Sequence, residues 1–260
     1  MADTIANPTA SMSKALGNAA QLHRALEEAG LSPEARQRVV DDPDFRLKLV
    51  RFWMGDATAA STTSAEAAQI MGSGYHGPED VELTFWLKFT QKQRKLLEVV
   101  PFSPEVLRAC SKTHVLVAGY PLSIMDMHRK MNKVFSDRDT PWYSLADERF
   151  AITTKVTMGW HLVRKSELPG STSQSWDVQQ AMVKGTASHA IPRACLVVFA
   201  MVVHFMVTGE RIIQPVWVDT NDTTARGYRV YLTFTPGGVC IRDWHSWPGD
   251  LGVAVSHKPS

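Results

Sequence analysis

The chain has 260 residues, of which 44% are hydrophobic and 21% are charged, and its formal net charge is +2. This composition is typical of a globular protein and excludes a disordered or collagen-like chain. A net charge so close to zero creates no strong field toward nucleic acid or anionic lipid, so we expect neither partner.

Three cysteines are spread along the chain, at Cys110, Cys195 and Cys240. Because their number is odd and two of them lie in apolar runs, we expect small buried hydrophobic residues in a reducing compartment. Residues 1–14 lack the basic and apolar regions of a secretory signal peptide. These features predict a cytoplasmic protein.

The first 54 residues predict an N-terminal helical region. Ser32 followed by Pro33, and Asp42 followed by Pro43, are typical starts of helices. If the protein forms oligomers, we expect these helices to mediate the contact.

Residues 55–80 are small, polar and glycine-bearing, which predicts a linker with one short helix near residues 65–71. Residues 81–260 are expected to form a single α+β domain. The elements expected in its first half are a helix over residues 81–100, a helix that begins at Pro104 after a Ser103 cap, a buried strand within residues 113–121, a helix over residues 123–131 and a half-buried strand over residues 159–165.

From about residue 155 the order becomes strand, helix, helix and a run of short strands. The apolar segment 191–210 has Pro192 at its expected first turn and Gly209 just beyond its last turn, which predicts a buried helix. Its apolar run is shorter than the roughly 20 residues that span a bilayer, and His204 within it is expected to be a hydrogen-bonded core residue. The other elements expected here are a helix over 175–185 and strands over 216–220, 228–234, 239–244 and 251–258. Two helices on one face of an antiparallel sheet predict an α+β fold.

Catalytic and metal motifs are weak throughout the sequence. The two Cys–His pairs, Cys110 with His114 and Cys240 with His245, lack the context of an activated nucleophile. The nine histidines show none of the close spacings that direct two ligands to one metal ion, so we expect no metal and no cofactor. The run "DTND" at residues 219–222 is better explained by a turn than by a calcium site.

The segment that follows residue 238 is different in kind. In "RDWHSWPGD", Trp244 and Trp247 flank His245 on a predicted loop between two strands. Tryptophan and arginine supply stiff contact area and planar hydrogen bonding, which favours a recognition surface. The alternative is that both tryptophans cover the core.

Four segments carry a resemblance to a known family: "WHLVRKSELPGSTSQSWDVQQAMV", "FAMVVHFMVTGERI", "VDTNDTTARGYRVYL" and "WHSWPGDLGVAVSHK". They resemble C-type-lectin-like domains, in particular the variable proteins of diversity-generating retroelements, over about residues 160–258. The resemblance implies a displayed binding segment made of Tyr231, Thr233, Arg242, Asp243, His245, Ser246, Trp247 and Asp250, with residues 251–255 as a fixed last strand. The calcium-binding triplets of sugar-binding lectins are absent from the sequence, so calcium-dependent sugar binding is not implied.

The sequence therefore favours a non-catalytic recognition protein that binds an unknown protein or small ligand. One alternative is a hydrolase or transferase that uses His161, His245 and Cys240 with Asp243 or Asp219. Another alternative is a structural subunit of an assembly, docked through residues 10–54.

Overall fold

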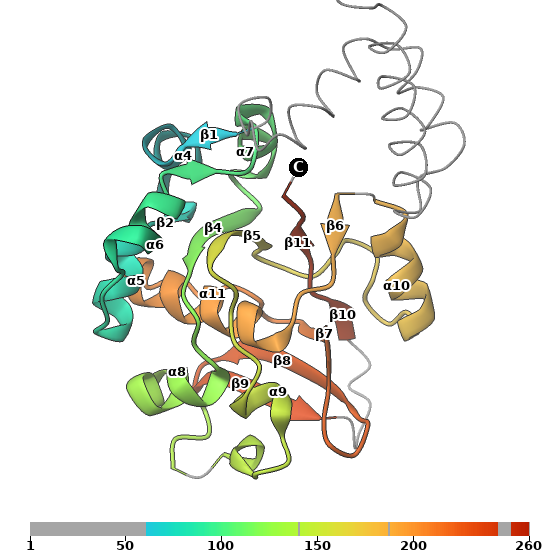
Figure 1. Cartoon of the computed structure of the whole chain (residues 1–260). Helices are drawn as coiled ribbons and strands as arrows, with labels where there is room; N and C mark the ends of the chain where they lie inside the picture. Colours follow the sequence, from blue (N-terminus) through green and yellow to red (C-terminus); the bar gives the residue numbers. More distant parts are fainter. Residues whose placement is uncertain (1–60, 140, 187, 244–250, 260) are drawn as a thin grey trace, which may run out of the picture. The chain divides into compact units, whose positions relative to one another are not determined.

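The structure, a computed structural model, describes residues 61–139, 141–186, 188–243 and 251–259 (Figure 1). The described residues belong to one compact unit, which covers residues 60–260. The predicted N-terminal helical region and the first part of the predicted linker therefore lie outside the described residues. In the described part of the chain, no helix is long and apolar enough to cross a membrane.

Helices and sheets are mixed along the described chain, which confirms the α+β class (Figure 1). A five-stranded sheet has the order β2-β4-β5-β11-β6, a four-stranded sheet has the order β10-β7-β8-β9, and β1 pairs with β3. The strands are β1 (Thr62–Thr63), β2 (Tyr75–His76), β3 (Val99–Val100), β4 (His114–Gly119), β5 (Gly159–Arg164), β6 (His189–Ala190), β7 (Trp217–Thr223), β8 (Arg229–Thr235), β9 (Gly238–Asp243), β10 (Leu251–Val253) and β11 (Ser256–His257).

The helices mostly begin where the sequence signals them. Ser103 caps its helix by accepting a hydrogen bond from Val106 N, and Pro104 is the first helical residue, as predicted. The helices besides the central one are α4 (Ser64–Met71), α5 (Pro78–Phe85), α6 (Gln91–Leu96), α7 (Pro104–Cys110), α8 (Ile124–Met131), α9 (Arg149–Ile152) and α10 (Trp176–Lys184), with 3-10 turns η2 (Gly72–Gly74), η3 (Asn132–Val134) and η4 (Trp142–Ser144).

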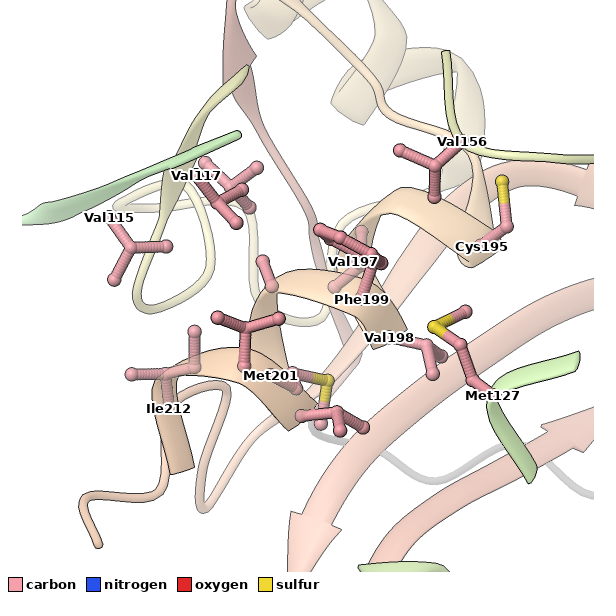
Figure 2. Close-up of a cluster of buried hydrophobic side chains, with 14 of the residues drawn as sticks. Val115, Val117, Met127, Val156, Cys195, Val197, Val198, Phe199, Met201 and Ile212 are labelled. Atoms are coloured by element: carbon pink, nitrogen blue, oxygen red, sulfur yellow. The ribbon is translucent and has the colours of Figure 1, made fainter. Parts of the chain in front are cut away.

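Helix α11 (Ala194–Thr208) lies between the two larger sheets (Figure 1). It contacts β2 and β4 of the five-stranded sheet and β7, β8 and β9 of the four-stranded sheet. Phe199 and its neighbours on every side of the helix are fully buried, and Val115 and Val117 of β4 and Met127 of α8 point toward them (Figure 2). A helix with sheets on both sides must be apolar all round, which explains the long Val-rich run.

Both ends of α11 test predictions from the sequence. Gly209 ends the helix in a left-handed conformation, with φ of 74°, as predicted. The first turn differs, because Pro192 lies before the helix rather than in its first turn. Arg193 is the residue that precedes the helix, and Asp222 Oδ2 accepts the Ala194 N–H at 2.7 Å. The predicted turn at residues 219–222 is therefore wrong: these residues belong to β7, and a strand carboxylate caps the central helix.

The predicted linker requires a correction from Thr62 onward. Strand β1, helix α4 and strand β2 occupy this segment, and Ala67 and His76 within it are fully buried. The short helix expected there is confirmed as α4, with Thr63 as its cap. Small residues here allow close packing rather than a flexible connection.

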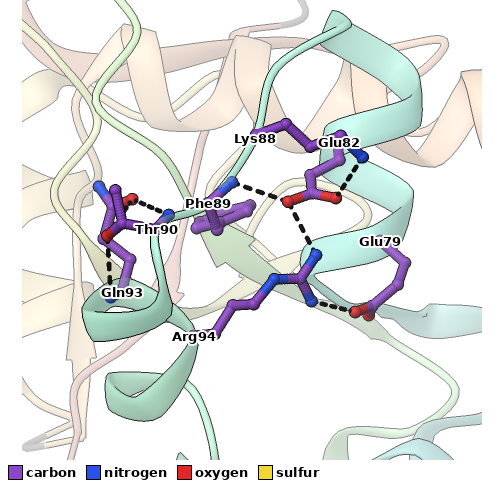
Figure 3. A network of polar contacts seen from close by, with 7 residues as sticks. All are labelled: Glu79, Glu82, Lys88, Phe89, Thr90, Gln93 and Arg94. Atoms are coloured by element: carbon purple, nitrogen blue, oxygen red, sulfur yellow. Dashed lines mark hydrogen bonds and ion pairs between the residues drawn. The ribbon is translucent and has the colours of Figure 1, made fainter.

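The helix expected over residues 81–100 is broken into α5 and α6 (Figure 3). Trp86 ends α5 in a left-handed conformation, with φ of 50°. The buried Glu82 carboxylate then accepts the Phe89 N–H at 2.7 Å, and Thr90 begins α6 with a capping box. Capping by polar side chains has overridden the continuous helical pattern.

The predicted last strand divides into two. Residues 251–253 form β10, which pairs in parallel with β7, whereas residues 256–257 form β11 between β5 and β6. The terminal sheet is thus not purely antiparallel, and α11 separates it from a second sheet that the sequence pattern did not reveal. The hairpin from β8 to β9 through Pro236 and Gly237 is as predicted.

Candidate functional site

The strand register of the four-stranded sheet defines one face opposite α11. Tyr231 of β8 lies directly between Asp219 of β7 and Arg242 of β9. Val230 and Leu232, which flank Tyr231 in β8, belong to the core around α11. Because side chains alternate along a strand, the other set points away from α11. We call it the outer face, and it consists of Trp217, Asp219, Tyr231, Thr233, Cys240 and Arg242.

Four of the predicted binding residues fall in this part of the sheet. Tyr231 and Thr233 are buried, with exposed fractions of 5% and 3%. The Tyr231 ring packs edge-on against Trp217, with centroids 5.2 Å apart. Arg242 is half-buried and pairs with Asp137 at 2.8 Å.

Thr233 has a structural partner within the sheet. Its hydroxyl donates to the Ile213 carbonyl at 2.9 Å, which anchors the segment leading into β7. Asp243 is half-buried at the end of β9. The remaining predicted residues, His245, Ser246, Trp247 and Asp250, lie outside the described residues, between β9 and β10.

Asp219 is the most unusual group on the outer face. Its exposed fraction is 3%, and its Oδ1 atom has no hydrogen-bond partner among the described residues. Burial raises the pKa of Asp219 to about 7, although the positive charge of Arg229 lowers it in part. Arg229 does not neutralise the carboxyl by contact, since its guanidinium stacks on the Trp176 ring of α10, 3.4 Å from the centroid.

A buried carboxyl group without a partner is costly, because it has lost its hydrogen bonds to water. With a pKa of about 7, Asp219 exists in both the neutral and the ionised form near neutral pH. It can therefore donate one hydrogen bond or accept several. Sequence reasoning placed Asp219 in the predicted strand 216–220, in the "DTND" turn and in the enzyme alternative, but it did not single out this aspartate between Val218 and Thr220 as a binding residue.

The residues of the enzyme alternative are divided between the two sheets. Cys240 and Asp219 share the outer face, where Cys240 is buried. His161 lies in β5 of the five-stranded sheet, where its Nε2 is 2.9 Å from the Thr157 carbonyl. Burial lowers the pKa of His161, partly offset by this hydrogen bond.

Two expectations for core residues are confirmed. All three cysteines are buried and free. His204 is fully buried and lies within hydrogen-bond distance of both His76 and Glu210. Its partner His76 was not singled out from the sequence.

No protein-family model, curated protein or solved structure matches this chain. Over the residues for which coordinates are described, no group of three or more His, Cys, Asp or Glu side chains is placed to hold a metal ion. The outer face is therefore interpreted from its own geometry.

Proposed function

We propose that the protein is a non-catalytic recognition protein that binds a partner through the outer face and the adjoining residues 244–250. In this proposal the described domain is of the C-type-lectin-like type found in variable proteins of diversity-generating retroelements. The single observation that carries it is the buried Asp219 carboxyl beside Trp217 and Tyr231, whose Oδ1 atom has no hydrogen-bond partner among the described residues.

The sheet supports this role because it is stiff. Strand β8 lies between two partners: it pairs with β9 over residues 230–235, and with β7 at Arg229, Tyr231 and Leu232 across one shift in register. The inner side chains of these strands pack on α11. Binding residues on such a scaffold lose little conformational entropy when a partner docks.

The chemistry of the outer face favours a partner that brings a hydrogen-bond donor or a cation. The Asp219 Oδ1 atom needs a donor, and the aromatic rings of Trp217 and Tyr231 lie next to it. Ammonium and guanidinium groups satisfy a carboxylate and also favour aromatic faces. A lysine or arginine side chain of a protein partner meets both requirements.

A selection experiment tests the proposal. A random peptide library is selected on the immobilised full chain, and the affinities of the recovered peptides are measured by calorimetry. We expect peptides enriched in lysine or arginine, with affinity reduced about tenfold or more by Asp219→Asn, the cost of losing a charge-assisted hydrogen bond. Double replacement of His245 and Trp247 by alanine is expected to abolish binding and to leave the melting temperature nearly unchanged.

Asp177→Asn provides the control, because Asp177 is an exposed carboxylate on α10 whereas Asp219 is buried in β7. Equal affinities for the wild type, Asp219→Asn and Asp177→Asn would contradict the proposal. A collapse of the fold in the His245 and Trp247 variant would assign those side chains to the core.

One observation favours the enzyme alternative. A carboxyl group with a pKa of about 7 is suited to act as a general acid or base at neutral pH. Asp219 would then work with Cys240 on the outer face and with His245. Hydrolysis of activated ester substrates that is lost in both Asp219→Asn and Cys240→Ser would support this alternative over the recognition role.

A further inference from the structure

A cluster of basic side chains lies on one face of the five-stranded sheet. His114 of β4 is directly opposite Arg164 of β5, and His257 of β11 is directly opposite both Leu162 of β5 and His189 of β6. Leu162 and Arg164 are two residues apart on one strand, so all of these side chains share one face. We call His114, Arg164, His189 and His257 the histidine cluster.

The three imidazole rings lie close together. The centroids of His189 and His257 are 5.0 Å apart, and those of His114 and His257 are 6.2 Å apart. His114 forms the buried base of the cluster, with an exposed fraction of 3%, whereas His189, His257 and Arg164 are half-buried. Phe102 packs edge-on against His257 and borders the cluster there.

Two ring nitrogens of the cluster have no hydrogen-bond partner among the described residues. They are Nε2 of His114 and Nδ1 of His189, and both atoms are buried. The other nitrogen of His114, Nδ1, is 2.8 Å from the Thr113 hydroxyl, so the ring is held in place. A buried and oriented ring nitrogen without a partner indicates a missing ligand atom.

The charge of the cluster has a single sign. The charged groups that act on the three rings are Arg164, Lys258 and the rings themselves, and no described carboxylate acts on them. Burial, followed by the charge of Arg164, lowers the pKa of His114 to about 3. Burial also lowers the pKa values of His189 and His257. Without a counter-charge, the rings therefore stay neutral.

We propose that the histidine cluster binds an oxyanion of the phosphate type. Arg164 supplies the fixed positive charge, His189 and His257 line the half-buried rim, and His114 Nε2 supplies a hydrogen bond at the base. Among the described residues, no group of three or more His, Cys, Asp or Glu side chains is placed to hold a metal ion, and the positive charge of Arg164 beside the rings favours an anion.

A phosphate ion fits the unpartnered nitrogens in either tautomer of His114. If the Thr113 hydroxyl donates to Nδ1, then Nε2 carries a proton and donates to a phosphate oxygen. If Nδ1 donates to the hydroxyl, then Nε2 is a bare lone pair and accepts the proton of monohydrogen or dihydrogen phosphate. Binding the anion also raises the proton affinity of all three rings, because an opposite charge favours the protonated form.

Nuclear magnetic resonance on the full chain tests this site with inorganic phosphate as the probe. The ¹⁵N signals of the imidazole rings report protonation and tautomer directly. We expect millimolar phosphate to shift the signals of His114, His189 and His257, with tighter binding at about pH 6 than at about pH 7.5. Arg164→Gln and His257→Gln are each expected to weaken binding about tenfold or more.

His161→Gln is the matched control. His161 lies on the same strand as Arg164, but alternation places it on the opposite face of the sheet. The proposal requires that this variant keep the phosphate affinity of the wild type.

Three outcomes would overturn the proposal. The first is that phosphate shifts none of the three ring signals. The second is that the His161 ring shifts as much as the three cluster rings, which would mean nonspecific binding. The third is that zinc ions shift the three rings at stoichiometric concentration while phosphate does not, which would assign the cluster to a metal. Because Arg164 and His257 are half-buried, both variants are expected to fold, and a circular dichroism spectrum checks this.

Discussion

His76 Nε2 lies 2.7 Å from His204 Nδ1, and both rings are fully buried. His204 Nε2 is 3.0 Å from the Glu210 carboxylate, which can only accept. His204 must therefore donate through Nε2 and accept through Nδ1, so His76 donates through Nε2. The His76 Nδ1 atom is left as a buried lone pair, 3.9 Å from Asp80 Oδ2. One exposed carboxylate thus determines the tautomers of two buried histidines.

This pair predicts a loss of stability in mild acid. Burial lowers the pKa of His204 to about 4, partly offset by the hydrogen bond to Glu210, whereas the unfolded chain titrates near 6.5. Between these values the unfolded chain binds more protons, so the free energy of unfolding falls as the pH drops from about 6.5 to about 4. The contribution of His204 is on the order of 1–3 kcal/mol.

Urea unfolding of the wild type and of His204→Asn at about pH 7 and about pH 5 measures this contribution. The variant is less stable at both values, but its stability is expected to depend less on pH. An identical dependence on pH in the wild type and in His204→Asn would refute the assignment.

Asp219 predicts the opposite dependence on pH. Its pKa in the folded chain, about 7, is above the unfolded value of 3.8 because the group is buried. Between these values the folded chain holds the extra proton, so the stability falls as the pH rises toward 7. Asp219→Asn removes this penalty, and the expected gain above pH 7 is on the order of 1–4 kcal/mol.

Thermal unfolding at about pH 5 and about pH 8 checks the prediction for Asp219. The variant should gain more melting temperature over the wild type at about pH 8 than at about pH 5, because the wild type loses stability across this interval. Together with a loss of peptide affinity in Asp219→Asn, this result would show that Asp219 lowers the stability of the protein but is needed for binding. Such a trade-off is common at functional sites.

Shortening a large buried side chain of the central helix is expected to cause a large loss of stability. Phe199 is fully buried in α11 and stacks on Phe85 of α5 with centroids 5.3 Å apart. Phe199→Ala leaves a cavity in the layer between the sheets and is expected to cost about 3–5 kcal/mol. Val207→Ala, at a half-exposed position of the same helix, is expected to change stability by less than about 0.5 kcal/mol. Chemical denaturation of both variants measures the difference.

A pair of adjacent glycines gives a conformational test. Gly238 begins β9 with φ of 127°, and a Cβ atom there would lie 2.4 Å from the Val134 carbonyl oxygen. Gly238→Ala is therefore expected to destabilise the protein by more than about 1 kcal/mol. A Cβ atom on Gly237 would meet nothing closer than 3.6 Å, so Gly237→Ala is the matched control. Equal unfolding midpoints for the two variants would contradict this account.

Local signals in the sequence predicted local structure well. Ser103 with Pro104 predicted the start of α7, and Gly209 after an apolar run predicted the end of α11, because capping depends on neighbouring residues. The same reasoning failed at Trp86, where the break in the helix depends on the buried carboxylate of Glu82.

The sites depend on contacts between distant residues. His76 and His204 are 128 residues apart, and the histidine cluster joins four strands far apart in the sequence. Register across a sheet is set by packing and by the path of the chain, which an amino-acid pattern does not specify. The sequence did place Tyr231 and Arg242 in neighbouring strands, because a short turn joins β8 and β9.

The division of the last strand couples the two sheets mechanically. Val253 pairs beside Asp219 in one sheet, and His257 pairs beside His189 in the other, with three residues of chain between them and a span of about 13 Å. Ala254 and Val255 are buried, and the Ala254 N–H donates to the Asp219 carbonyl. This short connection is therefore held in place and cannot lengthen. The sheets cannot slide past each other without breaking strand pairing, so strain applied to one sheet is transmitted to the other.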